Sequence, residues 1–260
     1  EEVINAGIEE AQKLNNKYPD GTFTKFNFLY RKRVWNTSEE CYLGWERKRG
    51  LLNQFNEYIL GKSKSEFLIN TIENSKEKFG QIPNIKYVIT LDSDTELCLN
   101  TGLEMIGAMA HILNRPVLNH KQDLVIDGHG LIQPRVGISL EDIQKSYFTK
   151  LYAGSGGKDA YSNAISDTYQ DNFGEGIFTG KGIYDLPVFS AVLANEIPEN
   201  TVLSHDLLEG SYLRCGLASD IMLLDGYPSG YNSFKARLHR WIRGDWQLVQ
   251  WLNSTIINKR

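Results

Sequence analysis

The chain is poor in cysteine and contains no long hydrophobic run. It has three cysteines in 260 residues, and no two of them form a C-x-x-C pair. An odd number of cysteines without that spacing argues against a disulfide framework or a structural zinc site, and fits a reducing compartment. No segment approaches the ~18 consecutive apolar residues of a membrane-spanning helix, and the first residues do not have the pattern of a signal peptide.

The chain also lacks an excess of positive charge. It has 28 Lys and Arg against 32 Asp and Glu, a net charge of −4 at pH 7 and a pI near 5.8. A nucleic-acid-binding surface is expected to be basic, so we expect no nucleic-acid partner. An anionic substrate would have to be bound by a few cations placed locally. Because the chain opens with Glu1-Glu2-Val3 and has no initiator Met, we expect it to be part of a larger protein.

Helical and strand patterns alternate along the chain. The periodicity of apolar residues predicts helices over 1–17, 45–60, 67–79, 99–113, 139–151, 187–195 and 232–252, with another beginning at Ser204, and strands over 26–34, 85–91, 124–126, 131–136 and 218–224. This alternation predicts an α/β fold with a mostly parallel sheet flanked by helices. With 41% hydrophobic residues and no visible linker or internal repeat, residues 1–260 are expected to form a single domain.

The segment 85–91 is a short apolar run that ends in two carboxylates, Asp92 and Asp94. Ligands of open α/β sheets bind beyond the carboxyl ends of such strands. Two carboxylates that approach one point are suitable ligands for Mg²⁺ or Mn²⁺ together with substrate phosphates. The alternative is a turn capped by Asp, because D-x-D also occurs by chance.

The tripeptide Ser204-His205-Asp206 precedes an apolar helical run. As a structural feature it would be a capping cluster at the start of a helix, where carboxylates are favoured. As a functional feature, Asp206 would be a general base that takes a proton from a sugar hydroxyl.

The segment 232–252 places Arg237, Arg240, Trp241 and Gly244 on one helical face. Planar, permanently charged guanidinium groups suit a diphosphate, and an indole offers a flat surface for a sugar ring. The alternative is a salt-bridged surface face with one anchoring Trp.

Between residues 174 and 184, several glycines surround Phe178 and Lys181. These glycines indicate bulges or a turn, or else the close approach of a ligand to the backbone.

Taken in order, Asp92-Ser93-Asp94, Phe178-Thr179-Gly180-Lys181-Gly182, His205-Asp206 and Arg237-x-x-Arg240-Trp241 resemble the processive inverting glycosyltransferases of family 2. Those enzymes have a GT-A-type α/β fold, a D-x-D metal site, a base Asp in a T-E-D tripeptide and a Q-x-x-R-W helix. Here Ser204-His205-Asp206 replaces T-E-D, and Arg237 replaces the Gln. These departures indicate a divergent branch.

The glycosyltransferase domain of cyclic β-1,2-glucan synthases, family 84, is the more similar branch. The resemblance rests on four motifs: Tyr30-Arg31-Lys32-Arg33-Val34-Trp35-Asn36, Gly44-Trp45-Glu46-Arg47-Lys48-Arg49-Gly50, Asp127-Gly128-His129-Gly130-Leu131-Ile132-Gln133-Pro134-Arg135-Val136 and Arg240-Trp241-Ile242-Arg243-Gly244-Asp245-Trp246-Gln247. It implies UDP-glucose as donor, a growing β-1,2-glucan as acceptor, and a membrane-embedded parent protein that holds this domain on the cytoplasmic face of the bacterial inner membrane.

The resemblance also implies roles for individual residues. Asp92 and Asp94 would bind Mg²⁺ or Mn²⁺ and the diphosphate, and Asp206 would be the catalytic base. The donor would further contact Arg237, Arg240, Arg47 and Lys48, and the acceptor would contact Trp241, Phe178, Gly180 and Lys181. The expected fold is a GT-A-type mixed, mostly parallel sheet that lacks its first nucleotide-binding strand, because no strand pattern precedes the first helix.

Two other functions are compatible with parts of the sequence. A metal-dependent phosphohydrolase could use the D-x-D motif, with Asp92 as its nucleophile, although it would leave the Arg and Trp face unexplained. A non-catalytic glycan-binding module could use the aromatic residues, 11% of the chain, as sugar platforms.

Overall fold

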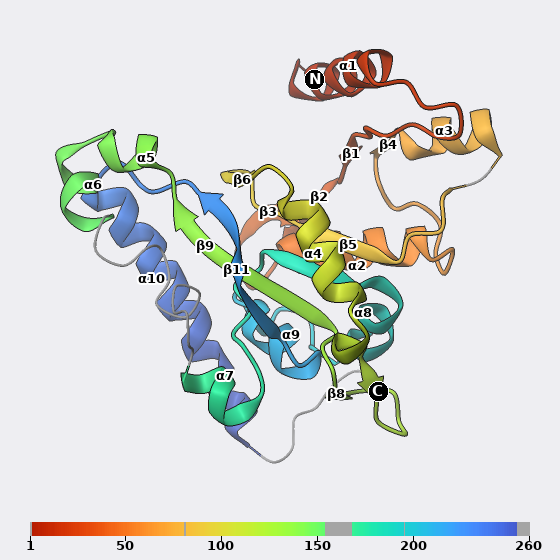
Figure 1. The fold of residues 1–260 in the computed structure, drawn as a ribbon. Helices are drawn as coiled ribbons and strands as arrows, with labels where there is room; N and C mark the ends of the chain where they lie inside the picture. The colour runs from red at the N-terminus through yellow and green to blue at the C-terminus, as the bar shows by residue number, and fades with distance from the viewer. Residues whose placement is uncertain (1, 81, 154–167, 195, 254–260) are drawn as a thin grey trace. The chain divides into compact units, whose positions relative to one another are not determined.

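The computed structural model describes residues 2–80, 82–153, 168–194 and 196–253 (Figure 1). The chain divides into two compact units, residues 1–85 and residues 86–260. The prediction of a single domain is not tested by this division and stays a prediction, as does the expectation of a missing nucleotide-binding strand.

In its described residues, the N-terminal unit combines three helices with two small antiparallel sheets. Its helices are α1 (Glu2–Lys17), α2 (Arg47–Ile59) and α3 (Ile72–Phe79). Strand β1 (Leu29–Tyr30) pairs with β4 (Ile69–Asn70), and β2 (Arg33–Asn36) pairs with β3 (Cys41–Gly44). The helices expected over 1–17 and 45–60 are confirmed, whereas only the second part of 67–79 is helical.

The strand expected over 26–34 is only partly formed, for a local reason. The Asn15 carboxamide accepts a hydrogen bond from the Phe26 amide at 3.0 Å and donates one to the Phe26 carbonyl at 2.7 Å. The Phe28 amide donates to the Thr71 hydroxyl at 2.8 Å. Side chains therefore satisfy backbone groups that a longer strand would have paired with a neighbour.

The C-terminal unit contains a five-stranded mixed sheet with the order β5-β10-β9-β11-β6. Its strands are β5 (Tyr87–Thr90), β6 (Thr95–Leu97), β9 (Leu131–Ile138), β10 (Gly182–Asp185) and β11 (Gly216–Asp225). A separate antiparallel pair joins β7 (Val117–Leu118) to β8 (Val125–Asp127). The mixed α/β arrangement with flanking helices is compatible with a GT-A-like fold.

The expectation that this sheet is mostly parallel is wrong. Among the strands that the structure describes in this sheet, only β9 and β11 pair in parallel, whereas β5 with β10, β10 with β9, and β11 with β6 are antiparallel. Alternating strands and helices give parallel pairs only where each helix crosses between strands that are neighbours in the sheet. Here β10 and β6 enter the sheet in the opposite direction to the strands beside them.

Helix α4 (Thr101–Ala110) packs on this sheet and forms part of its core (Figure 1). Met105 and Met109 on the helix contact a buried cluster that includes Ile132 of β9, Ile183 of β10 and Leu223 of β11. All of these side chains are at most 3% exposed. The sheet is thereby held rigid, so the loops at its edge have a fixed base.

The remaining helices lie around the same unit. They are η1 (Ile112–Asn114), α5 (Leu140–Gln144), α6 (Tyr147–Tyr152), α7 (Thr168–Phe173), α8 (Leu186–Leu193), α9 (Asp206–Tyr212), α10 (Tyr231–Gln247) and η2 (Leu248–Leu252). Ser139 caps α5 by accepting a hydrogen bond from the Asp142 amide at 3.1 Å. The single helix expected over 139–151 is nevertheless two helices, because Ser146 and Thr149 form a capping box that starts α6.

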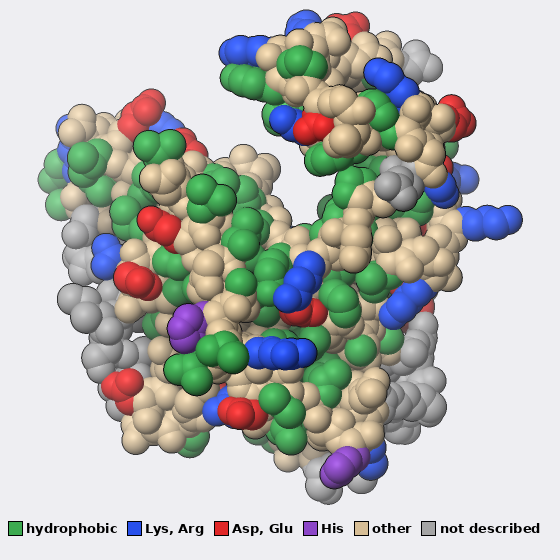
Figure 2. Space-filling model, turned by 45° about the vertical axis from the view of Figure 1, so that its right-hand side comes forward, with side chains coloured by type: hydrophobic (Ala, Val, Ile, Leu, Met, Phe, Trp, Pro, Cys, Tyr) green, Lys and Arg blue, Asp and Glu red, His purple; other side chains and the backbone are tan. Residues whose placement is uncertain are grey.

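On the face drawn in Figure 2, Lys and Arg side chains are interspersed with Asp, Glu and hydrophobic side chains. Among the described residues, no helix combines the length and the hydrophobicity needed to span a bilayer.

Candidate active site

The D-x-D segment forms a tight turn fixed to the end of β11. The Thr95 amide donates to the Asp92 carbonyl at 3.1 Å, and the Gly226 amide donates to the Asp94 carbonyl at 2.9 Å. The Thr95 hydroxyl also donates to Asp225, the last residue of β11. The side chains of Asp92 and Asp94 remain partly exposed, at 37% and 43%. The turn therefore presents both carboxylates to solvent on a backbone held by the sheet.

Lys181 lies between two of the acids in this region. Its ammonium group is 3.0 Å from Asp92 and 3.2 Å from Asp225, whose side chain is fully buried. Burial by itself lowers the pKa of Lys181, but the carboxylates of Asp225 and Asp92 outweigh burial and raise the pKa above its ordinary value. Lys181 therefore carries a permanent positive charge beside the D-x-D turn. Its predicted contact with the acceptor stays a prediction.

Helix α10 presents its basic and aromatic face to the same region. The Arg237 guanidinium is 3.9 Å from Asp94 and lies 5.8 Å from the centre of the Trp241 ring. Trp241 is 40% exposed, so much of its indole surface is available. A guanidinium over an indole is a cation–π arrangement, which orients both groups.

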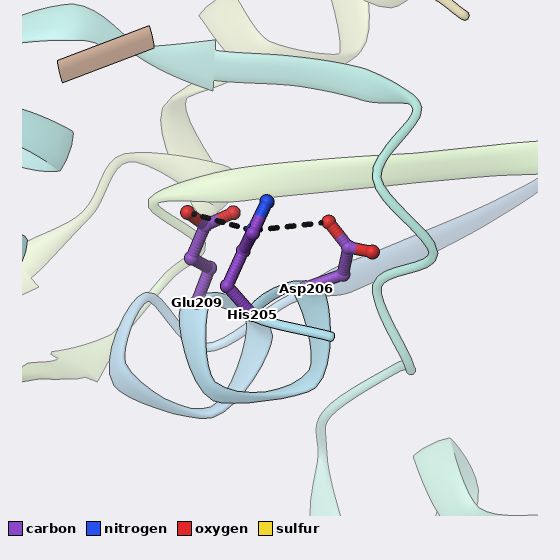
Figure 3. Close-up of side chains that lie close together, drawn as sticks. All are labelled: His205, Asp206 and Glu209. Atoms are coloured by element: carbon purple, nitrogen blue, oxygen red, sulfur yellow. Dashed lines mark ion pairs between the residues drawn. The ribbon is translucent and has the colours of Figure 1, made fainter. Parts of the chain in front are cut away.

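Asp206 is the first residue of α9, and its carboxylate is 30% exposed. The His205 ring lies beside it, with Nδ1 3.2 Å from Asp206 Oδ1 (Figure 3). His205 occupies the N-cap position of α9, but its side chain makes no capping hydrogen bond. His205 therefore does not have the capping role that was the structural alternative for Ser204-His205-Asp206.

One cleft collects these side chains. It has a volume of about 350 Å³ and is lined by Asp92, Asp94, Val136, Ile177, Phe178, Thr179, Lys181, Ser204, Asp206, Leu207, Asp225, Arg237, Arg240, Trp241 and Asp245. The D-x-D acids, the candidate base and the R-x-x-R-W residues are thus neighbours, although they are far apart in the sequence.

Two further residues predicted for the acceptor lie at this cleft. Phe178 lines it but is only 4% exposed, because it packs against Gly210 of α9. Gly180 has a left-handed backbone, φ +87°, and a Cβ placed there would lie 2.9 Å from Asp206 Oδ1. Gly180 therefore leaves room for the Asp206 carboxylate.

Arg47 and Lys48, predicted to contact the donor, begin α2 in the N-terminal unit. Arg47 is exposed and its guanidinium is 3.3 Å from Glu39. The neighbouring Arg49 is buried and paired with Glu46. Donor binding by Arg47 and Lys48 stays a prediction.

The structure adds two acids to the site that sequence reasoning missed. Asp225 directly follows the predicted strand 218–224, just as Asp92 directly follows the predicted strand 85–91. The same pattern, an apolar run before an acid, could therefore have identified Asp225. Asp245 lines the cleft from α10, and burial raises its pKa. It lies eight residues after Arg237, on the same side of the helix, and no local sequence pattern singled it out.

Gly244, which the sequence places on the Arg237 and Trp241 face, has a packing role. A Cβ at Gly244 would lie 2.1 Å from Ser204 Oγ. The neighbouring Gln247 carboxamide accepts a hydrogen bond from the Leu203 amide at 2.7 Å. The C-terminal half of α10 thus holds the segment that leads into Asp206.

No protein-family model matches the chain. The chain is 41% identical over 253 residues to a protein of Rhizobium meliloti (strain 1021) named cyclic beta-(1,2)-glucan synthase NdvB. The match covers 96% of this chain and 9% of that protein, so the chain spans about a tenth of the length of this relative.

Proposed function

Because the chain is a cyclic glucan synthase-related domain, we propose that it acts in glucan synthesis as an inverting, metal-dependent glucosyltransferase that uses UDP-glucose. The observation that supports this proposal is the common cleft. It joins a D-x-D turn, a partly exposed carboxylate at a helix start and two guanidinium groups next to an indole. These are the groups that transfer of a sugar from a nucleoside diphosphate requires.

In the proposed reaction, a hydroxyl oxygen of the acceptor forms a bond with C1 of glucose. The bond between C1 and the diphosphate oxygen breaks, and its electron pair leaves with UDP. The hydroxyl proton passes to Asp206, which acts as general base on the face opposite the leaving group. Inversion at C1 needs only this one base.

Negative charge develops on the leaving diphosphate during this step. Arg237 and Arg240 line the cleft as fixed, permanently charged donors, and hold the diphosphate through planar hydrogen bonding. Trp241 offers its exposed indole surface to the acceptor sugar.

The carboxylates of Asp92 and Asp94 fit a hard divalent cation, because both are partly exposed, oxygen-only donors on one rigid turn. Bound there, Mg²⁺ or Mn²⁺ would neutralise diphosphate charge. Lys181 holds Asp92 in place from the protein side.

We further propose that the acceptor is a growing β-1,2-glucan. We also propose that the domain belongs to a larger membrane-embedded protein and lies on the cytoplasmic face of the bacterial inner membrane. The support is the name of the relative and the small share of its length that this chain spans.

Donor binding is tested by calorimetry of UDP with Mn²⁺. Asp94→Ala removes one of two carboxylates and is expected to abolish the metal-dependent part of the affinity. Glu104→Ala is the matched control, since Glu104 is an exposed acid on α4 outside the cleft. Metal-dependent affinity that is equal in wild type and Asp94→Ala would contradict the metal assignment.

Transfer is tested with UDP-glucose and a glucan acceptor in the full-length protein that contains this chain. Asp206→Asn is expected to leave donor binding unchanged and to lower turnover by roughly 10²–10⁴-fold, the usual contribution of a general base. Wild-type turnover in this variant at saturating donor would show that Asp206 is not the base.

A further inference from the structure

A buried histidine lies between two carboxylates at the start of α9 (Figure 3). His205 Nδ1 is 3.2 Å from Asp206 Oδ1 and 3.2 Å from Glu209 Oε1. The His205 side chain is 8% exposed, and the Glu209 side chain is 2% exposed. Both are ion-pair distances. Because ionised carboxylates only accept hydrogen bonds, a ring that carries a hydrogen on Nδ1 is the form that suits both oxygens.

The burial of Glu209 defines its relation to the histidine. A buried carboxylate is costly unless a cation or a hydrogen-bond donor faces it. His205 lies one helical turn before Glu209 and places its Nδ1 within ion-pair distance of Glu209 Oε1. Glu209 in turn favours the tautomer, or the charged form, of His205 that has a hydrogen on Nδ1, as carboxylates do for histidines in other sites.

The opposite side of Asp206 is bounded by Gly180. The missing side chain at Gly180 leaves space for both carboxylate oxygens, which a Cβ there would approach to 2.9 and 3.2 Å. The Asp206 carboxylate is therefore held between the His205 ring and the Gly180 backbone. A base fixed in this way keeps its reactive oxygen toward the cleft.

We propose that His205 and Glu209 are positioning residues for Asp206. The His205 Nδ1–H group orients the carboxylate and stabilises its ionised form, and Glu209 keeps that hydrogen on Nδ1. This inference rests on the proposed role of Asp206 as general base. The other charged groups that line the cleft around Asp206 come from other elements and are Asp92, Asp94, Lys181, Asp225, Arg237, Arg240 and Asp245.

The test compares two variants of His205 in the full-length protein. His205→Leu removes the donor, whereas the amide nitrogen of His205→Asn can replace Nδ1. We expect His205→Leu to lower kcat by about 10- to 100-fold with unchanged affinity for UDP, and His205→Asn to restore most of it, since a hydrogen bond to a charged group is lost in the first and kept in the second. Glu209→Gln should lower kcat by a smaller factor.

The pH profile separates positioning from a structural role. The acid limb of kcat/KM reports ionisation of the base in the free enzyme. Without the Nδ1–H donor, the ionised carboxylate is less favoured, so the limb moves to higher pH in His205→Leu and stays in place in His205→Asn. Thermal unfolding of each variant shows whether the fold is retained.

Three results would overturn the inference. The first is an unshifted acid limb with wild-type kcat in folded His205→Leu. The second is a failure of folded His205→Asn to restore activity. The third is Mn²⁺ binding that survives Asp94→Ala and disappears in His205→Leu, which would make His205, Asp206 and Glu209 a metal site.

The failure of this inference can be distinguished from the failure of the proposed function. If Asp206→Asn retains wild-type turnover, the proposed function itself fails. If Asp206→Asn is inactive while folded His205→Leu is unaffected, only the positioning role fails.

Discussion

At the scale of single residues, the site depends on a buried cation. Lys181 is 10% exposed at its side chain and is shared by Asp92, which faces the cleft, and Asp225, which does not. Because the pKa of Lys181 is raised, its charge is retained throughout the neutral range and beyond. Lys181 thus offsets the charge of the buried acid and leaves Asp94 as the more accessible carboxylate of the turn.

We expect Lys181→Met to destabilise the protein by about 3–5 kcal/mol, because it leaves Asp225 buried without its cation. Denaturation in urea measures this change. Lys13→Met should have no measurable effect, since Lys13 and Glu10 form a solvent-exposed pair on α1.

The pKa of Lys181 is higher in the folded than in the unfolded protein. The stabilisation by Lys181 is therefore complete below the unfolded value, ~10.4, and is lost as pH rises through the folded value. The difference between wild type and Lys181→Met should therefore shrink only in strongly alkaline solution.

Gly180 offers a test of space at Asp206. Gly180→Ala and Gly80→Ala both place a side chain on a left-handed backbone, at φ +87° and +83°, which costs about 1–2 kcal/mol. Only at Gly180 would the new methyl group meet Asp206, whereas nothing lies within 4 Å at Gly80. We expect similar losses of stability but a fall in turnover of about 10²-fold for Gly180→Ala alone. Equal turnover in the two variants would show that Asp206 has room to move.

At the scale of elements, α10 has two roles along one face. Its middle presents Arg237 and Trp241 to the cleft, and its C-terminal part packs closely against Ser204 through Gly244. The helix thus connects the proposed diphosphate-binding side of the cleft to the segment that leads into Asp206. A shift of α10 would therefore move Arg237 and Asp206 together.

We expect Gly244→Ala to cost about 1–3 kcal/mol through overpacking, and to lower turnover by displacing the segment before Asp206. Gly107→Ala in α4 is the matched control, because nothing lies within 4 Å of a Cβ there and Ala favours a helix by up to ~1 kcal/mol. Urea denaturation and transfer assays on both variants provide the comparison. A Gly244→Ala protein as stable and active as Gly107→Ala would contradict the close packing.

Helices with long periodic patterns could be predicted from the sequence, whereas the order and direction of strands could not. The segments 1–17, 45–60 and 232–252 show a helical periodicity of apolar residues locally, and the structure contains α1, α2 and α10 there. The three-residue strand β6 is too short to show a pattern, and its pairing with β11 depends on contacts between distant residues. The direction of β10 likewise follows from the tertiary packing and not from its glycines and β-branched residues.

At the scale of the whole molecule, the three cysteines differ in exposure. Cys41 of the N-terminal unit is exposed, whereas in the C-terminal unit Cys98 is partly buried and Cys215 is 0% exposed. Burial raises the pKa of the Cys215 thiol well above its ordinary value. The thiolate that reacts with most reagents is therefore scarce at this position.

We expect a thiol reagent at pH 8 to modify Cys41 rapidly in the native protein and to modify Cys215 only when the C-terminal unit unfolds. Mass spectrometry of peptides after labelling in increasing urea measures both positions in one sample. Cys41→Ser serves as the control that removes the Cys41 signal, and the peptide of the partly exposed Cys98 is followed separately. Modification of Cys215 at the native rate of Cys41 would contradict the buried position given to β11.

The candidate site could be predicted as a set of residues but not as an arrangement. Asp94, Asp206 and Arg237 come from segments with separate local patterns, and the cleft brings them together. Asp225 belongs to the site because β11 pairs with β6, which places Asp225 opposite Thr95. The roles of these residues in donor and acceptor binding stay predictions.

The parallel pairing of β9 with β11 has a consequence for the order of folding. It places Ile132 opposite Gly216, so a long intervening stretch of chain must close before these two strands can pair with each other. Asp225 ends β11, and the turn that carries Asp94 is bonded to that end. We therefore expect the carboxylates of Asp94 and Asp225 to come together after the local helices have formed. A cation or nucleotide bound there would act on a nearly finished fold and slow its unfolding, without guiding the first steps of chain collapse.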